Sequence, residues 1–193
     1  MPTANEVSGP QWVARFPGSS RLDDLAEPFK SAAVGFVTAV RNAGCSVTIS
    51  ATFRPPERAW LMRFSTAIAR GEMQPEDVKP NPAIAIEWVH RTDSGAPDPA
   101  KSRSAAIQMR DAYRISPTSP LPALASRHTE RNAVDMSISW VGTLKIVQKD
   151  GSTREISSSP RTGLNAELIQ VGADYGVIKA QFKDDPHWSN DGH

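Results

Sequence analysis

Apolar residues in the first half of the chain are spaced as in two amphipathic helices separated by a strand. A first helix is expected over residues 25–44, because apolar residues recur there at every third or fourth position and a glycine follows. Residues 46–53 alternate polar and apolar side chains and are rich in β-branched residues, which is typical of a half-buried strand. A second helix follows over residues 55–71. The strand therefore delivers Arg54 to a strand-to-helix junction.

The second half of the chain mixes further strands and helices. Residues 132–140 alternate again, and Asp135 lies on the less apolar of the two faces. Two short apolar runs flank an Asp-Gly turn and predict a hairpin over residues 144–156. Further strands are expected at 83–89 and 176–182, and further helices at 102–113 and 164–173. This order predicts an α+β fold in which an antiparallel sheet is backed by helices.

The length and composition fit one globular domain. The 193 residues are 39% hydrophobic and 22% charged, which is ordinary for a chain that buries a core. Residues 1–21 are rich in Pro, Ser and Gly and are expected to form a lead-in segment, which Trp12 and Phe16 could anchor to the body. Residues 22–193 are then expected to form a single domain.

Charge and cysteine content exclude several classes of partner and site. The net charge of +1 gives no electrostatic case for a nucleic-acid partner. The single Cys45 excludes an intrachain disulfide and a multi-cysteine zinc site, so a metal would need histidine and carboxylate ligands. No stretch approaches the roughly 18 apolar residues of a membrane span, and the N-terminus lacks the features of a secretory signal. We therefore expect no membrane span and synthesis in the cytoplasm.

Two histidines and one aspartate are candidate metal ligands. His128 and His187 lie in short polar segments beside predicted strands, and Asp135 lies within one of these strands. Two histidines and one carboxylate leave the fourth position of a zinc ion open, as in a catalytic site. The spacing alone leaves open an alternative in which His128 is solvated and Asp135 forms an ordinary salt bridge. The other two histidines, His90 and His193, are expected to have no metal role.

Three short motifs together resemble those of the D-alanyl-D-alanine carboxypeptidases and L-alanyl-D-glutamate endopeptidases. Residues 126–135, S-R-H-T-E-R-N-A-V-D, resemble the S-x-H-x-x-G-x-A-x-D signature of this family. Residues 184–188, D-D-P-H-W, resemble its closing motif of an acidic residue, two variable residues, a histidine and an aromatic residue. Phe53 and Arg54 resemble its aromatic-Arg motif. The three motifs occur in the family's order.

The sequence departs from the family pattern at two positions. Arg131 replaces the glycine of the signature, at a turn where glycine would permit a positive φ that arginine resists. Arg58 stands where the family often has a glutamine. The first departure is expected to change the turn locally without loss of a ligand. The second weakens any assignment of substrate specificity.

The resemblance implies a zinc site and gives roles to five residues. It implies that His128, Asp135 and His187 bind Zn²⁺. Asp184 is then the general base, which takes a proton from the attacking water and later donates it to the leaving amine. Arg54 is expected to hold a carboxylate of the substrate or the developing oxyanion, because its planar fork of donors suits both tasks.

The supporting site residues each have an alternative interpretation. Arg54 could instead form a structural ion pair with Glu57. Ser126 could orient a ligand or contact substrate, or it could cap the adjacent turn. Asp185 is another candidate base, but neighbours in an extended segment face opposite sides, and the family's spacing favours the residue before it. Trp188 could pack against the metal site and contact substrate, or be a core tryptophan.

By this resemblance the chain has the fold shared by Hedgehog domains and D-Ala-D-Ala peptidases. It would hydrolyse peptide bonds in peptidoglycan stem peptides, as an endopeptidase or a D,D-carboxypeptidase. The absence of a signal peptide favours a phage-type lysin, or a wall-degrading toxin delivered by a secretion machine and paired with an inhibitory immunity protein. Two alternatives stay open: a non-hydrolytic, zinc-stabilised cell-wall or protein-binding module, and a metal-free structural protein of a phage particle. The acid at position 184 favours the enzyme.

Overall fold

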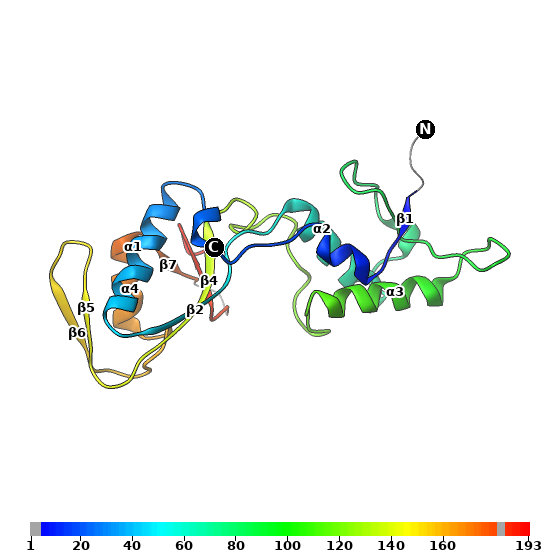
Figure 1. The fold of residues 1–193 in the computed structure, drawn as a ribbon. Coiled ribbons are helices and arrows are strands. Elements are labelled where there is room, and N and C mark those ends of the chain that lie inside the picture. The colour runs from blue at the N-terminus through cyan, green and yellow to red at the C-terminus, as the bar shows by residue number, and fades with distance from the viewer. Residues whose placement is uncertain (1–4, 181–183) are drawn as a thin grey trace. The chain divides into compact units, whose positions relative to one another are not determined.

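The computed structural model of the chain describes residues 5–180 and 184–193. These residues cluster in two compact units, whose elements are traced in Figure 1. Unit 1 comprises Met1–Pro17 and Pro55–Leu124, and unit 2 comprises Gly18–Arg54 and Ala125–His193. Each unit has its own hydrophobic core. The single domain predicted over residues 22–193 thus takes in parts of both units.

Unit 1 is built on two helices and a short parallel strand pair. Trp12 is 3% exposed and lies in the core of this unit, where it anchors the N-terminal segment. The strand pair joins β1 to β3 with Glu6 opposite Ile86. The elements are β1 (Glu6–Val7), the 3₁₀ helix η1 (Pro10–Ala14), α2 (Pro56–Arg70), the 3₁₀ helix η3 (Pro75–Asp77), β3 (Ile86–Glu87) and α3 (Pro99–Ala112).

Two predicted boundaries in unit 1 were wrong. The strand expected over residues 83–89 is only the two residues of β3, because β1 offers no more than two residues to pair with it. The apolar run instead fills the core, where Ile84, Ile86 and Trp88 are all buried. The helix expected from residue 102 already begins at Pro99, since the side chain of Asp98 accepts the N–H of Lys101 at 2.9 Å and caps the first turn.

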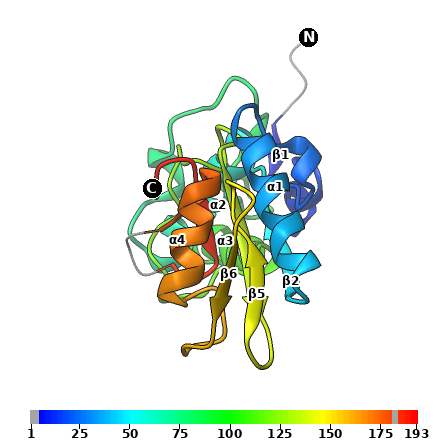
Figure 2. The same cartoon turned by 90° about the vertical axis from the view of Figure 1, so that its left-hand side faces the viewer.

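Unit 2 is an antiparallel sheet of four strands in the order β2-β4-β8-β7, with α1 and α4 packed against one face (Figures 1 and 2). The apolar side chains of β4 join both helices in one core, whereas Asp135 lies on the opposite face of the strand. This arrangement confirms the α+β class with an antiparallel sheet. The elements are the 3₁₀ helix η2 (Leu22–Asp24), α1 (Phe29–Asn42), β2 (Ser46–Ala51), β4 (Ala133–Ser139), β5 (Leu144–Val147), β6 (Thr153–Ile156), α4 (Ala166–Tyr175), β7 (Ile178–Lys179) and β8 (His187–Ser189).

The ends of the elements in unit 2 follow local chemistry. The first helix begins at Phe29 rather than at residue 25, directly after Pro28. The helix expected from residue 164 begins at Ala166, because the side chain of Asn165 accepts the N–H groups of the first turn. The hairpin of β5 and β6 forms as predicted. Of the strand expected over residues 176–182, only β7 is a strand among the described residues, and 181–182 lie outside them.

Candidate metal centre

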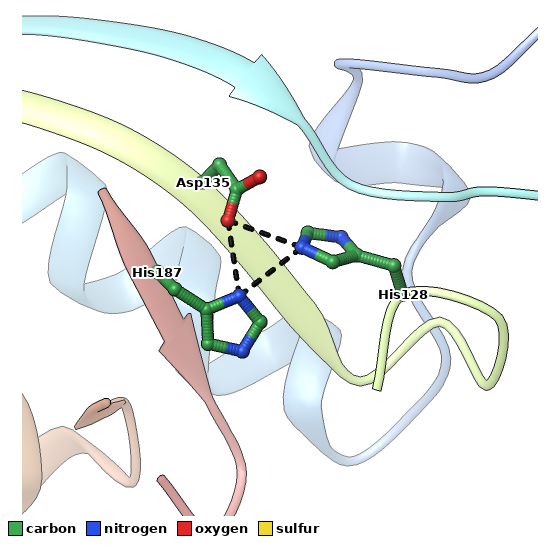
Figure 3. A group of neighbouring side chains, drawn as sticks. All are labelled: His128, Asp135 and His187. Carbon is green, nitrogen blue, oxygen red and sulfur yellow. Dashed lines mark hydrogen bonds and ion pairs between the residues drawn. The ribbon is translucent and has the colours of Figure 1, made fainter. Parts of the chain in front are cut away.

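Two neighbouring strands and one loop bring the predicted ligands together. Asp135 in β4 is the direct register partner of His187, the first residue of β8. His128 lies in the loop that precedes β4, and its carbonyl accepts the N–H of Arg54 at 3.2 Å. This bond ties the ligand loop to the end of β2. Figure 3 shows that all three side chains point toward one another.

The distances among the three ligand atoms fit a tetrahedral zinc ion. Oδ1 of Asp135 lies 3.1 Å from Nε2 of His128 and 3.0 Å from Nδ1 of His187. The two imidazole nitrogens are 3.2 Å apart. In a tetrahedral zinc site with bonds of about 2.0–2.1 Å, ligand atoms are separated by about 3.3 Å. The group is therefore arranged as a metal-binding group would be.

The far nitrogens of the imidazoles determine which atoms face the centre. Nδ1 of His128 lies 3.2 Å from the carbonyl oxygen of Thr52, and Nε2 of His187 lies 3.1 Å from the main-chain oxygen of His193. These oxygens can only accept, so we assign a proton to each far nitrogen. With a metal bound, the other nitrogen of each ring would direct its lone pair at the point that the carboxylate of Asp135 also faces. Three such lone pairs at about 3 Å would repel one another unless a proton or a metal cation lay between them.

Burial and charge prepare the carboxylate for this task. His128 and His187 are 4% and 5% exposed, and the side chain of Asp135 is 18% exposed. Burial acts to raise the pKa of Asp135, but in the absence of a metal the hydrogen bonds and positive charge of the two imidazoles outweigh burial and hold the pKa well below its ordinary value. The aspartate is therefore an anion, as a metal ligand must be.

The turn between the ligands keeps the backbone that a glycine would give. Arg131 has a φ of +63°, so the expected local change of the turn was wrong. Its guanidinium lies 3.9 Å from the ring centroid of Phe53 and donates to the carbonyl of Asp24 at 3.1 Å. Its carbonyl accepts the N–H of Ala26 at 2.9 Å. These contacts compensate for the left-handed backbone.

The last residues turn back over His187. The hydroxyl of Ser189 accepts the N–H groups of Gly192 and His193 at 2.8 and 3.1 Å. The guanidinium of Arg127 bonds both carboxylate oxygens of Asp191, with Nε at 3.1 and 3.0 Å. Because Arg127 is the neighbour of His128, this pair links the loop of one ligand to the segment that fixes the ring of the other.

The structure places the candidate base beside the ligands but outside their cluster. Asp184 is half-buried, and its carbonyl accepts the N–H of His187 at 3.1 Å. Burial acts to lower the pKa of His187, but Asp135, His193 and the charge of Asp184 outweigh it and raise the pKa. Asp184 thus lies near enough to act on the centre electrostatically. The other candidate base, Asp185, is exposed.

The two remaining predicted residues are placed differently from each other. The buried hydroxyl of Ser126 makes no hydrogen bond in the described part of the chain. The turn is capped by Thr129 instead, whose hydroxyl donates to the carbonyl of Ser126 at 2.7 Å and accepts its N–H at 3.0 Å. Trp188 is fully buried in the core of unit 2, with its ring 5.4 Å from that of Phe36. It has the position of a core tryptophan.

Sequence reasoning missed the atoms that orient the ligands. The carbonyls of Thr52 and His193 are main-chain groups, which every residue carries, so no residue type reveals them. Lys179, whose ammonium contacts the carbonyl of His187, lies in a strand of only two residues and was given no role. A lysine between the apolar residues Ile178 and Ala180 was an available signal.

No protein-family model matches this chain, and a search of curated proteins finds no match either. No helix among the described residues is both long and apolar enough to cross a bilayer. The function therefore has to be argued from the site.

Proposed function

We propose that this protein is a zinc-dependent hydrolase of peptide bonds in peptidoglycan stem peptides. The observation that carries the proposal is the convergence of Nε2 of His128, Nδ1 of His187 and Oδ1 of Asp135 within 3.0–3.2 Å of one another. The three ordered motifs add the substrate class. The proposal includes the fold shared by Hedgehog domains and D-Ala-D-Ala peptidases, with which the α+β arrangement of unit 2 is compatible.

The residues of the site divide the chemistry among them. A bound zinc ion would polarise the scissile carbonyl and lower the pKa of the attacking water. Asp184, three residues before a ligand and not itself part of the ligand group, takes the proton from that water and returns it to the leaving amine. Arg54 holds a substrate carboxylate or the developing oxyanion. Ser126, whose hydroxyl has no hydrogen-bond partner among residues 5–180 and 184–193, contacts substrate.

The proposal extends to where the enzyme acts. It would act on the cell wall as a phage-type lysin or as a secreted wall-degrading toxin, and as an endopeptidase or a D,D-carboxypeptidase. For the toxin, a neutralising immunity protein is the expected partner.

One observation favours a second candidate, a zinc-stabilised binding module without hydrolytic activity. Both histidines are at least 95% buried, as in sites where zinc serves the fold. A binding module needs no acid at Asp184, however, and its charge acts directly on His187. The hydrolase explains this acid and is the better proposal.

Digestion of purified peptidoglycan tests the proposal. The zinc-loaded wild type, Asp184→Ala, Asp185→Ala and a chelated sample are compared, and released fragments are identified by mass spectrometry. We expect fragments from the wild type and Asp185→Ala only, with Asp184→Ala losing about 10²–10⁴-fold in rate while keeping one zinc per chain. The new amino terminus names the bond. Equal yields from wild type and Asp184→Ala would refute the mechanism, and a zinc-loaded but inactive wild type would favour the binding module.

A further inference from the structure

Lys179, in β7, is a buried cation whose three donors all bond main-chain oxygens around His187. The residue is 7% exposed. Its Nζ donates to the carbonyl oxygens of Asp184 at 3.1 Å, Asp185 at 2.6 Å and His187 at 3.1 Å. An ammonium group has three N–H donors, so these bonds use its full capacity.

The surroundings of Lys179 indicate that hydrogen bonds to the main chain, and not an ion pair, stabilise its ammonium group. Among the described residues, no carboxylate forms an ion pair with Lys179. The ring of Trp188 lies 5.4 Å from Nζ and lines the site of the charge. Burial lowers the pKa of Lys179 by more than the nearby charges of Asp184, Asp185 and Asp135 raise it. Burying a charged group costs free energy, so a buried ammonium is stable only where it forms hydrogen bonds of good geometry.

The three bonds close the segment that carries both the candidate base and a ligand. Within it, the N–H of His187 donates to the carbonyl of Asp184 at 3.1 Å, which forms a turn. The N–H of Ala180 donates to the carbonyl of His187 at 3.0 Å. The ammonium of Lys179 therefore bonds the main chain at the start and the end of this turn.

We propose that Lys179 is a positioning residue of the metal centre, which fixes the turn so that His187 reaches the ion and Asp184 reaches the attacking water. The part that concerns Asp184 rests on the proposed function, whereas the part that concerns His187 rests on the metal centre alone. Groups that orient metal ligands typically contribute about 10–100-fold to metal affinity.

Zinc affinity of Lys179→Met tests the proposal, measured by competition with a chromophoric chelator. Methionine keeps an unbranched stem and removes the charge and all three donors. We expect zinc to bind about 10–100-fold more weakly than to the wild type. The matched control is Lys145→Met on β5, where an exposed lysine pairs with Glu155 in a hairpin that is not part of the sheet carrying Asp135 and His187. Its zinc affinity is expected to equal that of the wild type.

A second pair of measurements separates positioning from general stabilisation. Thermal unfolding of the zinc-free proteins reports the fold, and kcat and KM of the zinc-saturated proteins report the placement of Asp184. We expect Lys179→Met, once saturated, to lose kcat with little change in KM. A zinc-free fold that is weakened while zinc affinity and kcat stay at wild-type values would overturn the proposal.

Lys179→Arg keeps the proposal testable if the methionine variant does not fold. Arginine retains the charge but spreads its donors over a planar fork, so no single nitrogen can donate three hydrogen bonds as Nζ of lysine does. We expect zinc affinity between those of the wild type and Lys179→Met, and wild-type affinity in this variant would overturn the proposal. Zinc binding needs no peptidoglycan, so a wild type that cleaves nothing refutes the hydrolase and leaves this comparison decisive.

Discussion

Unit 1 and unit 2 each bury histidine, but in opposite chemical settings. His90 of unit 1 is 8% exposed, and its Nε2 lies 3.1 Å from both the hydroxyl and the carbonyl of Ser8. The carbonyl can only accept, so this nitrogen carries a proton and is satisfied where it lies. In unit 2, His128 and His187 use their far nitrogens in this way and turn the other nitrogen toward a carboxylate.

The difference teaches that burial of a histidine does not identify a metal site. The two settings have similar exposure, and each contains a ring nitrogen bonded to a main-chain oxygen. Among the described residues, unit 2 alone adds an anion at a point where two ring nitrogens already converge. A ligand set is therefore recognised by what the second nitrogen of each ring does.

The largest expected effect comes from removal of the anion in unit 2. A zinc site of about 10–16 kcal/mol spread over three protein ligands gives each about 3–5 kcal/mol. Asp135→Asn is therefore expected to weaken zinc binding by about a hundred-fold or more. Zinc at about 100 times the wild-type Kd should add about 2.7 kcal/mol to the free energy of unfolding of the wild type, but at most about 0.4 kcal/mol to that of the variant. Urea titrations with and without zinc measure this stabilisation in both proteins. Equal stabilisation of the wild type and Asp135→Asn would show that the anion of unit 2 does not bind the metal.

The corresponding substitution in unit 1 is expected to have a smaller effect, on stability and not on zinc binding. His90→Ala removes the partner of Ser8 and is expected to cost about 1–3 kcal/mol of unfolding free energy through the buried groups left unpaired. Its zinc affinity should equal that of the wild type, because His90 is no part of the ligand group. If His90→Ala instead lost zinc affinity and kept the unfolding free energy of the wild type, His90 would be a metal-site residue and not a structural one.

The sequence predicted the candidate ligands but not the groups that orient them. His128, Asp135 and His187 were predicted from residue type, order and resemblance, and the structure brings all three together. The orientation of the rings depends on the carbonyls of Thr52 and His193, which no residue pattern marks. Main-chain atoms are the same at every position, so only the folded geometry selects them.

The fold shows the same division between pattern and geometry. The long periodic segments that became α1 and α2 were predicted within a few residues. β8 was not predicted as a strand, because three residues are too few to show an alternation. The division into two units was not predicted either, since unit 1 combines two stretches that are separate along the chain, Met1–Pro17 and Pro55–Leu124.

Arg131 sharpens the comparison, since it shapes the loop that carries His128 to Asp135. Arg131→Ala keeps the left-handed φ and loses a cation–π contact and a hydrogen bond, which together contribute about 1–2 kcal/mol. Arg131→Gly loses the same contacts but relieves about 1 kcal/mol of backbone strain. We therefore expect the alanine variant to be about 1 kcal/mol less stable than the glycine variant in urea unfolding. Equal stability of the two would show that the left-handed backbone is not strained.

The smallest expected effect concerns the pair that holds the last residues over His187. The bond from Arg127 holds the pKa of Asp191 at about 2, below its ordinary value. A lowered pKa means that the stabilisation is complete above the unfolded-state pKa of about 4 and is lost as the pH falls from there toward about 2. The difference in unfolding free energy between wild type and Asp191→Asn should therefore be full at pH 6 and shrink below pH 4, in chelated protein. Because both side chains are about one-third exposed, added salt should reduce this difference, and a salt-independent difference would mean that the segment is held by other contacts.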